Sequence, residues 1–428
     1  MRVFEPSRAC AARLDAADSL AHFRGEFALP LAADGQALIY LAGHSLGLAP
    51  LAAPKRVVEE LDDWRRLGVL GHEQSRRPWF HYDDCFTRGL AALCGARGDE
   101  VAALNSLSAN LHFLLAAFYQ PTRTRHKILV EAGAFSSDRH VAVSQLRWHG
   151  LAADQSLVEL APRDGEDLLR IDDIERCIAN AGDSLALVLW PGVQYRTGQS
   201  FDMRRIAAIT HGVGAILCLD LAHAIGNVPL ALHDWGVDCA AWSSYKYLNA
   251  GPGAIGGAFL HQRHFTDATL RPLLGWWGHA RESRLQLGAE HRAAPGIAAW
   301  AVSNPPILSA APMLASLEQF ERAGLASLRA KSMQLTAWLE YLLQMRCRES
   351  LQQVTSTDPA ERGAQLSIRV RGGGEHARAV FAALLPLGLV ADWREPDIIR
   401  IAPAPLYNSH DDVWRAVEVL HQALSRIP

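Results

Sequence analysis

The sequence predicts an α/β protein in which helices cover both faces of a mostly parallel sheet, followed by a smaller α+β domain. Apolar runs of strand length occupy residues 185–190 and 215–220, and a helical segment that starts at Phe201 lies between them. Apolar strands that alternate with helices are typical of a parallel sheet buried on both faces. A long helix over about 312–346 then leads to a different pattern, with strands expected at 366–370 and 397–401 and helices around 375–385 and 410–425.

The length and composition fit a soluble globular protein of more than one domain. The chain has 428 residues, of which 49% are hydrophobic and 20% charged. We expect an N-terminal segment over 1–55 that contributes to the small domain, a large cofactor-binding domain over 56–311, and a small C-terminal domain over 312–428.

The net charge limits the kinds of partner to expect, and the cysteines indicate the cellular compartment. A formal net charge of -3 gives no general electrostatic reason to bind nucleic acid or an anionic membrane. The seven cysteines are widely spaced and include no Cys-x-x-Cys pair, which favours a reducing compartment and predicts no metal site. No signal peptide opens the chain and no apolar run reaches the ~18 residues of a membrane span, so we expect a cytoplasmic protein.

The N-terminal elements lead to a glycine-bounded turn. Helix and loop over 1–30 precede a short strand at 37–41, and the turn follows at 43–47. Pro50 and Pro54 then introduce a helix, and the polar stretch 71–79 predicts a loop, with a functional loop as the less frequent alternative.

Strand ends between 101 and 223 carry the first candidate site residues. A strand over 101–104 leads into a helix with Ser106 and Ser108 as candidate caps, where a phosphate site and a purely structural cap both stay open. Further strands are expected at 127–131 and 156–160, with a helix at 171–181. Ligands of parallel sheets bind beyond the carboxyl ends of the strands, which is where we expect Phe135, Asp138, Asp220 and His223.

Lys246 is the strongest candidate for a catalytic residue. Apolar segments flank it, and a lysine desolvated there would have a lowered pKa and be a better nucleophile. Pyridoxal phosphate needs such an amine, a carboxylate for its ring nitrogen, an aromatic face, and a pocket rich in N–H groups. Lys246, Asp220, Phe135 and the turn at 107–108 could supply these in turn. Arg400, a charge in the apolar run 398–402, predicts either a structural ion pair or a clamp on a substrate carboxylate.

The chain resembles the kynureninases, which are fold-type-I pyridoxal-phosphate hydrolases of tryptophan catabolism. The clearest segment is Ser-Tyr-Lys-Tyr-Leu-Asn-Ala-Gly at 244–251. Other matching segments are spread over nearly the whole chain, at 40–48, 71–73, 77–79, 105–112, 195–198, 220–228, 233–238, 274–279, 303–307 and 400–408.

The resemblance implies a role for each candidate residue. Lys246 forms the Schiff base with the cofactor, Asp220 pairs with the pyridine nitrogen, and Phe135 stacks on the ring. Tyr245 reaches the phosphate and is our candidate proton donor. The other residues implied in the cofactor pocket are Leu107, Ser108, Ser136, Ser137, Asp138 and His223.

The resemblance also implies a homodimer with shared active sites. Trp276 and Asn304 are expected from the partner subunit. Arg400 is expected to hold the substrate's α-carboxylate, while Ser45, His72 and Asn304 are expected near its aryl end. The substrate is then L-kynurenine or 3-hydroxy-L-kynurenine, cleaved by water to L-alanine and anthranilate or 3-hydroxyanthranilate. The long form of the family favours the hydroxylated compound.

Some positions depart from the family pattern. His44 stands where asparagine is common, Ser136 replaces a frequent proline, and Pro191 replaces a serine or threonine that contacts the cofactor. Trp277 is bulkier than the usual phenylalanine and is expected to reshape the aryl pocket. Another enzyme of the same fold, an aminotransferase or a cysteine desulfurase, is the alternative function, and a non-catalytic pyridoxal-binding module is a further one.

Overall fold

A seven-stranded sheet forms the centre of the larger part of the molecule in this computed structural model, which describes residues 4–288 and 290–427. Five neighbouring strands are parallel, while β8 runs antiparallel to both β7 and β2. In sheet order the strands are β2 (Val101–Ala103), β8 (Gly257–Leu260), β7 (Cys239–Trp242), β6 (Ile216–Asp220), β5 (Leu185–Pro191), β3 (Lys127–Glu131) and β4 (Leu157–Leu160). The predicted mostly parallel sheet is confirmed.

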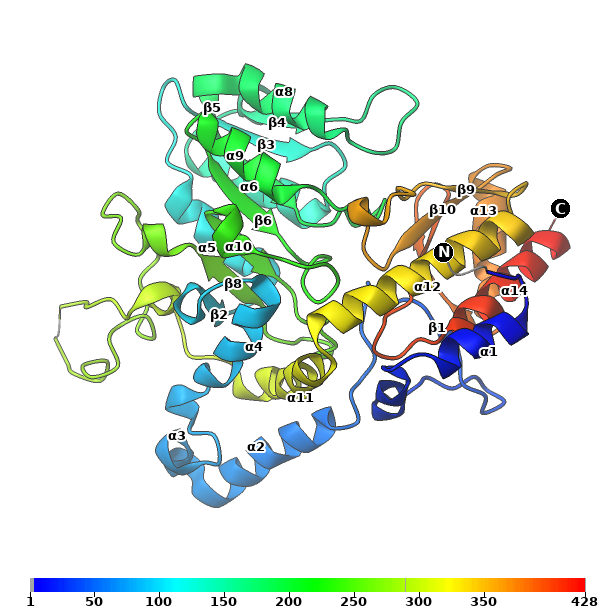
Figure 1. Ribbon diagram of the computed structural model, residues 1–428. Coiled ribbons are helices and arrows are strands. Elements are labelled where there is room, and N and C mark those ends of the chain that lie inside the picture. Colours follow the sequence, from blue (N-terminus) through cyan, green and yellow to red (C-terminus); the bar gives the residue numbers. More distant parts are fainter. Residues whose placement is uncertain (1–3, 289, 428) are drawn as a thin grey trace.

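Both faces of this sheet are buried, as the continuous apolar strands predicted. Successive residues of β5 point to opposite sides, so that Val188 and Trp190 join one hydrophobic core and Leu187 and Leu189 join another. Helices flank the sheet (Figure 1), namely α5 (Leu107–Phe118), α6 (Ser136–Trp148), α7 (Ala153–Ser156), α8 (Ile171–Ala181), α9 (Met203–Gly212) and α10 (Leu232–Trp235).

A four-stranded antiparallel sheet forms the smaller part. Its strands, in order, are β12 (Asp392–Arg394), β13 (Ile398–Ile401), β10 (Leu366–Val370) and β9 (Leu351–Gln353). The helices beside it are α12 (Leu325–Arg346), α13 (Gly374–Leu384) and α14 (His410–Arg426). The predicted strands and helices of this region are therefore present.

The N-terminal segment packs on this smaller part. Helix α1 (Arg8–Ala16) lies beside α14, and β1 (Ile39–Tyr40) pairs in parallel with β11 (Leu389–Val390). Leu14 and Leu41 belong to the same hydrophobic core as α12 and α14, and Figure 1 shows both chain ends on this side. Helix α1 and strand β1 thus pack with the smaller part, whereas Leu20, Phe23, Phe27 and Leu48 of the same segment join the core of the larger part.

The helical stretch predicted over about 312–346 is present, but it consists of two helices and begins earlier, at Ile307. Helix α11 (Ile307–Ala323) ends at Gly324, whose φ of 75° ends the helical conformation and changes the direction of the backbone before α12 begins. Helix α11 packs against α2 (Ala53–Leu67) and α4 (Asp84–Cys94) and joins the core of the larger part, whereas α12 runs on to the smaller one (Figure 1). We therefore propose that the small domain begins within α12 rather than at residue 312.

Two local predictions also need correction. The stretch 71–79, expected as a loop, contains the short helix α3 (Gly71–Gln74), because buried Glu60 and Asp63 of α2 bind Arg77 and the Arg76 N–H and fold the segment back. Ser106 does occupy the cap position of α5, but its side chain makes no capping hydrogen bond. Within the described residues, no helix is both long and apolar enough to cross a membrane.

Candidate active site

One cavity lies at the carboxyl ends of β3, β5, β6 and β7, where the strand pattern predicted a ligand site. It collects predicted site residues from four separate segments. Those that line it are Leu107, Ser108, Phe135, Ser137, Asp138, Asp220, His223, Tyr245 and Lys246. The sequence therefore predicted most of this cavity.

Lys246 lies in the loop after β7 and is only 8% exposed. Its Nζ lies 5.8 Å from the ring centroids of both Phe135 and Tyr245. Burial lowers the pKa of Lys246 to about 8, although Asp220 acts in the opposite direction. The side chain is therefore a desolvated amine, as the apolar flanks predicted.

Three buried carboxyl groups surround this amine. Asp220 ends β6 and accepts a hydrogen bond from the Ala222 N–H at 2.7 Å. Burial raises the pKa of Asp220, against the attraction of Lys246. Asp138, in the first turn of α6, has its pKa raised well above the usual value by burial and by Asp220.

The third carboxyl group, Glu131, was not among the predicted site residues. It is the last residue of β3, lines the cavity, and receives one hydrogen bond, from Gln194 Nε2 at 3.2 Å. Burial raises the pKa of Glu131 to about 8. Its position at the end of an apolar strand, matching that of Asp220 in β6, was the signal that could have found it.

The residues of the cavity fit pyridoxal phosphate. A buried amine faces a buried carboxylate, Phe135 offers an aromatic face, and the N-terminus of α5 opens onto the cavity through Ser106, Leu107 and Ser108. Two buried polar atoms near it, Ser243 Oγ and His223 Nδ1, have no hydrogen-bond partner among residues 4–288 and 290–427. Pro191 also lines the cavity, and its ring offers no donor where a serine or threonine is common.

Arg400 is fully buried behind this cavity rather than on its surface. Its Nε donates to Asp392 Oδ1 at 2.8 Å and its Nη1 donates to the backbone oxygen of Tyr195 at 2.5 Å. Burial lowers the pKa of Arg400 to about 10, while Asp392 opposes that shift. Tyr195 itself lines the cavity, so one residue separates the guanidinium from the space that a substrate would enter.

Several predicted residues do not line the cavity. Ser136 is exposed at the start of α6, and Ser45 lies in the turn after β1. His72 on α3 stacks on Phe80 with ring centroids 4.7 Å apart. Trp276 is 44% exposed, and Asn304 lines a different hollow together with the buried Trp277. The structure of one chain therefore does not bring these residues to Lys246.

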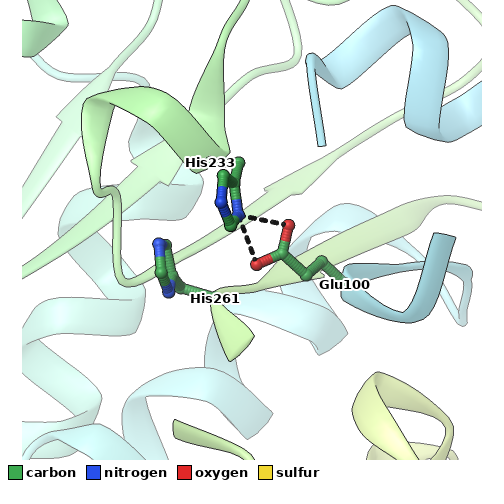
Figure 2. Close-up of side chains that lie close together, drawn as sticks. All are labelled: Glu100, His233 and His261. Atoms are coloured by element: carbon green, nitrogen blue, oxygen red, sulfur yellow. Dashed lines mark hydrogen bonds and ion pairs between the residues drawn. The ribbon is translucent and has the colours of Figure 1, made fainter. Parts of the chain in front are cut away.

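A second polar cluster, of Glu100, His233 and His261, has potential ligand atoms within 4.8 Å of one another (Figure 2). His233 Nδ1 lies 2.9 Å and 3.0 Å from the two Glu100 oxygens, which also accept the N–H groups of Arg97 and Gln262. The two imidazole planes are stacked at 7°. Because imidazole lone pairs lie in the ring plane, stacked rings cannot both point at one ion, so this geometry is that of a structural ion pair.

Solved structures with the same fold match this one at low sequence identity. A cysteine desulfurase from Escherichia coli matches with a TM-score of 0.76 at 17% identity, covering 100% of both chains. A cysteine desulfurase from Thermococcus onnurineus matches with a TM-score of 0.71 at 18% identity, covering 91% of this chain and 95% of that one. The fold is that of the fold-type-I pyridoxal-phosphate enzymes.

Sequence relatives give the family. The model of the kynureninase C-terminal domain matches residues 328–420. A kynureninase from Xanthomonas campestris is 50% identical over 412 residues, 96% of this chain and 97% of its own. One from Myxococcus xanthus is 48% identical over 418 residues, 98% of this chain and 97% of its own. The chain therefore belongs to the kynureninase family of pyridoxal-phosphate-dependent hydrolases, which act on carbon–carbon bonds.

Proposed function

We propose that the protein hydrolyses L-kynurenine, 3-hydroxy-L-kynurenine or both, releasing L-alanine and anthranilate or 3-hydroxyanthranilate. The observation that carries this proposal is the buried pair of Lys246 and Asp220 in one cavity of a chain that belongs to this family. The test is to incubate the cofactor-loaded protein with each compound and to measure the aromatic acid and alanine formed. Absence of both products would refute the proposal.

Pyridoxal phosphate, when bound, supplies the electron sink that makes the substrate's Cα proton acidic. Lys246 would hold the cofactor covalently, Asp220 would hold its ring nitrogen, and Phe135 would pack on its ring. A free Lys246 amine would accept the Cα proton, and its lowered pKa of about 8 suits a base near neutral pH. Tyr245 is our candidate for the later proton donor, because its ring lies beside Lys246 Nζ.

The other residues that we propose for the cofactor are Leu107, Ser108, Ser137, Asp138 and His223, which line the cavity, and Ser136, which does not. Arg400 is the residue that we propose for the substrate. Arg400 and the cavity are linked through Tyr195, whose backbone oxygen accepts from Nη1. We propose that the substrate's α-carboxylate approaches Arg400 beside this contact. A bidentate guanidinium grip would then fix the orientation of Cα over the amine.

A homodimer is part of the proposal, because Trp276 and Asn304 do not line the cavity of their own chain. We propose that they complete the partner's site, with Ser45 and His72 near the aryl end of the substrate. Support comes from α2, which carries Val58, Leu61 and Trp64 exposed at helical spacing, an apolar face with no partner within the described chain. Trp64→Glu should convert a dimer to a monomer in sedimentation velocity, whereas an unchanged dimer would place the interface elsewhere.

The substrate preference and the pathway depend on one comparison. We propose that 3-hydroxykynurenine is the better substrate, with His72 and Asn304 contacting its hydroxyl group, which gives the protein a role in NAD biosynthesis. The ratio of kcat/KM for the two compounds tests this. A wide margin for unsubstituted kynurenine would shift the role to tryptophan degradation.

The alternative function on this fold is that of an aminotransferase or a cysteine desulfurase. None of the seven cysteines, all described and all free thiols, lines the cavity, and desulfurization needs such a thiol. The free thiols also support our proposal that the protein works in the cytoplasm. Release of sulfide from cysteine, or of a keto acid from kynurenine, would favour the alternatives.

A further inference from the structure

His44 sits in a turn that the surrounding residues hold tightly in place. The Ser45 N–H donates to the Ala42 oxygen at 2.9 Å and closes the turn. Gly43 lies against the Tyr407 hydroxyl, which a Cβ on Gly43 would meet at 2.1 Å. The Gly47 N–H donates to the Tyr245 oxygen at 2.8 Å, directly before Lys246. His44 is therefore fixed between the small domain and the loop of the catalytic lysine.

The imidazole of His44 is completely buried, and neither ring nitrogen has a hydrogen-bond partner in the part of the chain that the structure describes. A buried polar group without a partner is costly, and most such groups in proteins are satisfied. His223, whose ring centroid lies 6.4 Å away, has an unpartnered Nδ1 and does line the cavity. Together the two histidines have three ring nitrogens without a partner among the described residues, and of the two only His223 lines the cavity.

The charged groups that act most strongly on His44 are positive. Burial lowers the pKa of His44 well below its ordinary value, and Arg400, Arg394 and Lys246 lower it further. The parallel bridge between Ala42 and Ala402 brings the turn beside the end of β13. Lys246, Arg394 and Arg400 act on the ring directly, and the His223 ring lies beside it. The other titratable groups nearby are Tyr247 and Asp392, which act on Arg400, and Tyr407, which lies against Gly43. Asp392 is the carboxylate among them, and it is already bound to Arg400.

We propose that His44 is a recognition residue for the α-carboxylate of the amino-acid substrate, to which it donates a ring N–H beside Arg400. The proposal rests on the function proposed above. An arriving carboxylate would satisfy the unpartnered imidazole and offset the surrounding cations. The same anion raises the pKa of His44, so that binding takes up protons at a pH between the free and bound values. Affinity then falls as the pH rises through that window.

The test is a proton count with cofactor-loaded protein and L-alanine as the probe. Calorimetric titrations in two buffers of different ionisation enthalpy give the protons taken up on binding. We expect the wild type to take up more protons than His44→Asn, whose amide donates a hydrogen bond without titrating. His421→Asn, which removes an exposed histidine from α14, should match the wild type. Equal proton uptake by the wild type and His44→Asn would overturn the proposal. Failure of both proteins to bind L-alanine would overturn it as well.

A second variant separates recognition from packing. His44→Leu should raise KM by about 10- to 100-fold, the range for losing a hydrogen bond to a charged group, with a smaller change in kcat. The KM of His44→Asn should lie close to that of the wild type. Equal KM values for His44→Leu and the wild type would overturn the assignment. Thermal unfolding of each variant checks folding, and His44→Gln replaces any asparagine variant that fails it. A protein that shows the proton difference but no kynurenine cleavage would refute the proposed function and retain the carboxylate site.

Discussion

Asp220 and Lys246 face one buried cavity from neighbouring strands, and each favours the charge on the other. Asp220 pairs in register with Ala241 of β7, and Lys246 follows on the loop after that strand. Lys246 lowers the pKa of Asp220, and Asp220 raises that of Lys246, while burial acts against both charges. The fold therefore keeps two opposite charges in one cavity, where either charge alone would be costly.

Replacing the lysine should abolish turnover. Lys246→Ala removes both the covalent attachment of the cofactor and the base, so we expect kcat for kynurenine to fall by at least about 10⁴-fold. Borohydride trapping followed by mass spectrometry should find the cofactor on Lys246 of the wild type and none on the variant. Lys55→Ala, on the exposed side of α2, is the control and should keep its activity. Turnover close to wild type would disprove the assignment of Lys246.

Replacing Asp220 should change the pH at which the Lys246 amine reacts. Asp220→Asn removes the negative charge that raises the pKa of Lys246, so this pKa should fall below about 8. A neutral amine is the form that attacks an aldehyde. We therefore expect the pH profile for attachment of pyridoxal phosphate to the apoprotein to move to lower pH. Cofactor affinity should also weaken, and an unshifted profile would mean that Asp220 does not act on the amine.

Glu131 should make the protein lose stability as the pH rises. Burial raises its pKa from 4.5 to about 8, so the native state holds a proton that the unfolded chain releases. For an acid with a raised pKa, stability is lost between these two pH values and is constant above about 8. Glu131→Gln keeps an oxygen for Gln194 Nε2 and removes the titration.

Melting temperatures at pH 5 and pH 8 test this prediction. The variant should gain stability relative to wild type at the higher pH, by on the order of a few kcal/mol. Glu375→Gln, an exposed carboxylate in the first turn of α13, should leave the pH dependence unchanged. A variant that loses stability at pH 8 would show that Glu131 is ionised in the native protein.

Residues at the ends of apolar strands are the part of the site that the sequence predicts best. Asp220 and Lys246 could be placed at one edge of the sheet because apolar strands of known direction end there. The break at Gly324 could not be predicted, since a lone glycine is tolerated in many helices. The packing of α11 on α2, which is distant in the sequence, determines where α11 ends. The burial of Glu131 likewise depends on Gln194, which reaches it from another segment.

Gly47 provides the last prediction, because it joins the N-terminal turn to the lysine loop. A Cβ on Gly47 would lie 2.3 Å from the Lys246 oxygen and 2.2 Å from Asn249 Oδ1. Asn249 has a φ of 55°, so its backbone is already held in a rarely used conformation. The added methyl group of Gly47→Ala must therefore displace the backbone of the Lys246 loop, which should lower the free energy of unfolding by about 1–3 kcal/mol.

We expect Gly47→Ala to lower the melting temperature and to reduce kcat more than the stability loss alone explains, because Lys246 moves with its backbone. Gly25→Ala is the matched control, since a Cβ there meets nothing within 4 Å and its φ is not positive. It should change neither quantity measurably. If Gly47→Ala lost stability but kept the full kcat, the position of Lys246 would depend on β7 and its own loop rather than on the turn at 43–47.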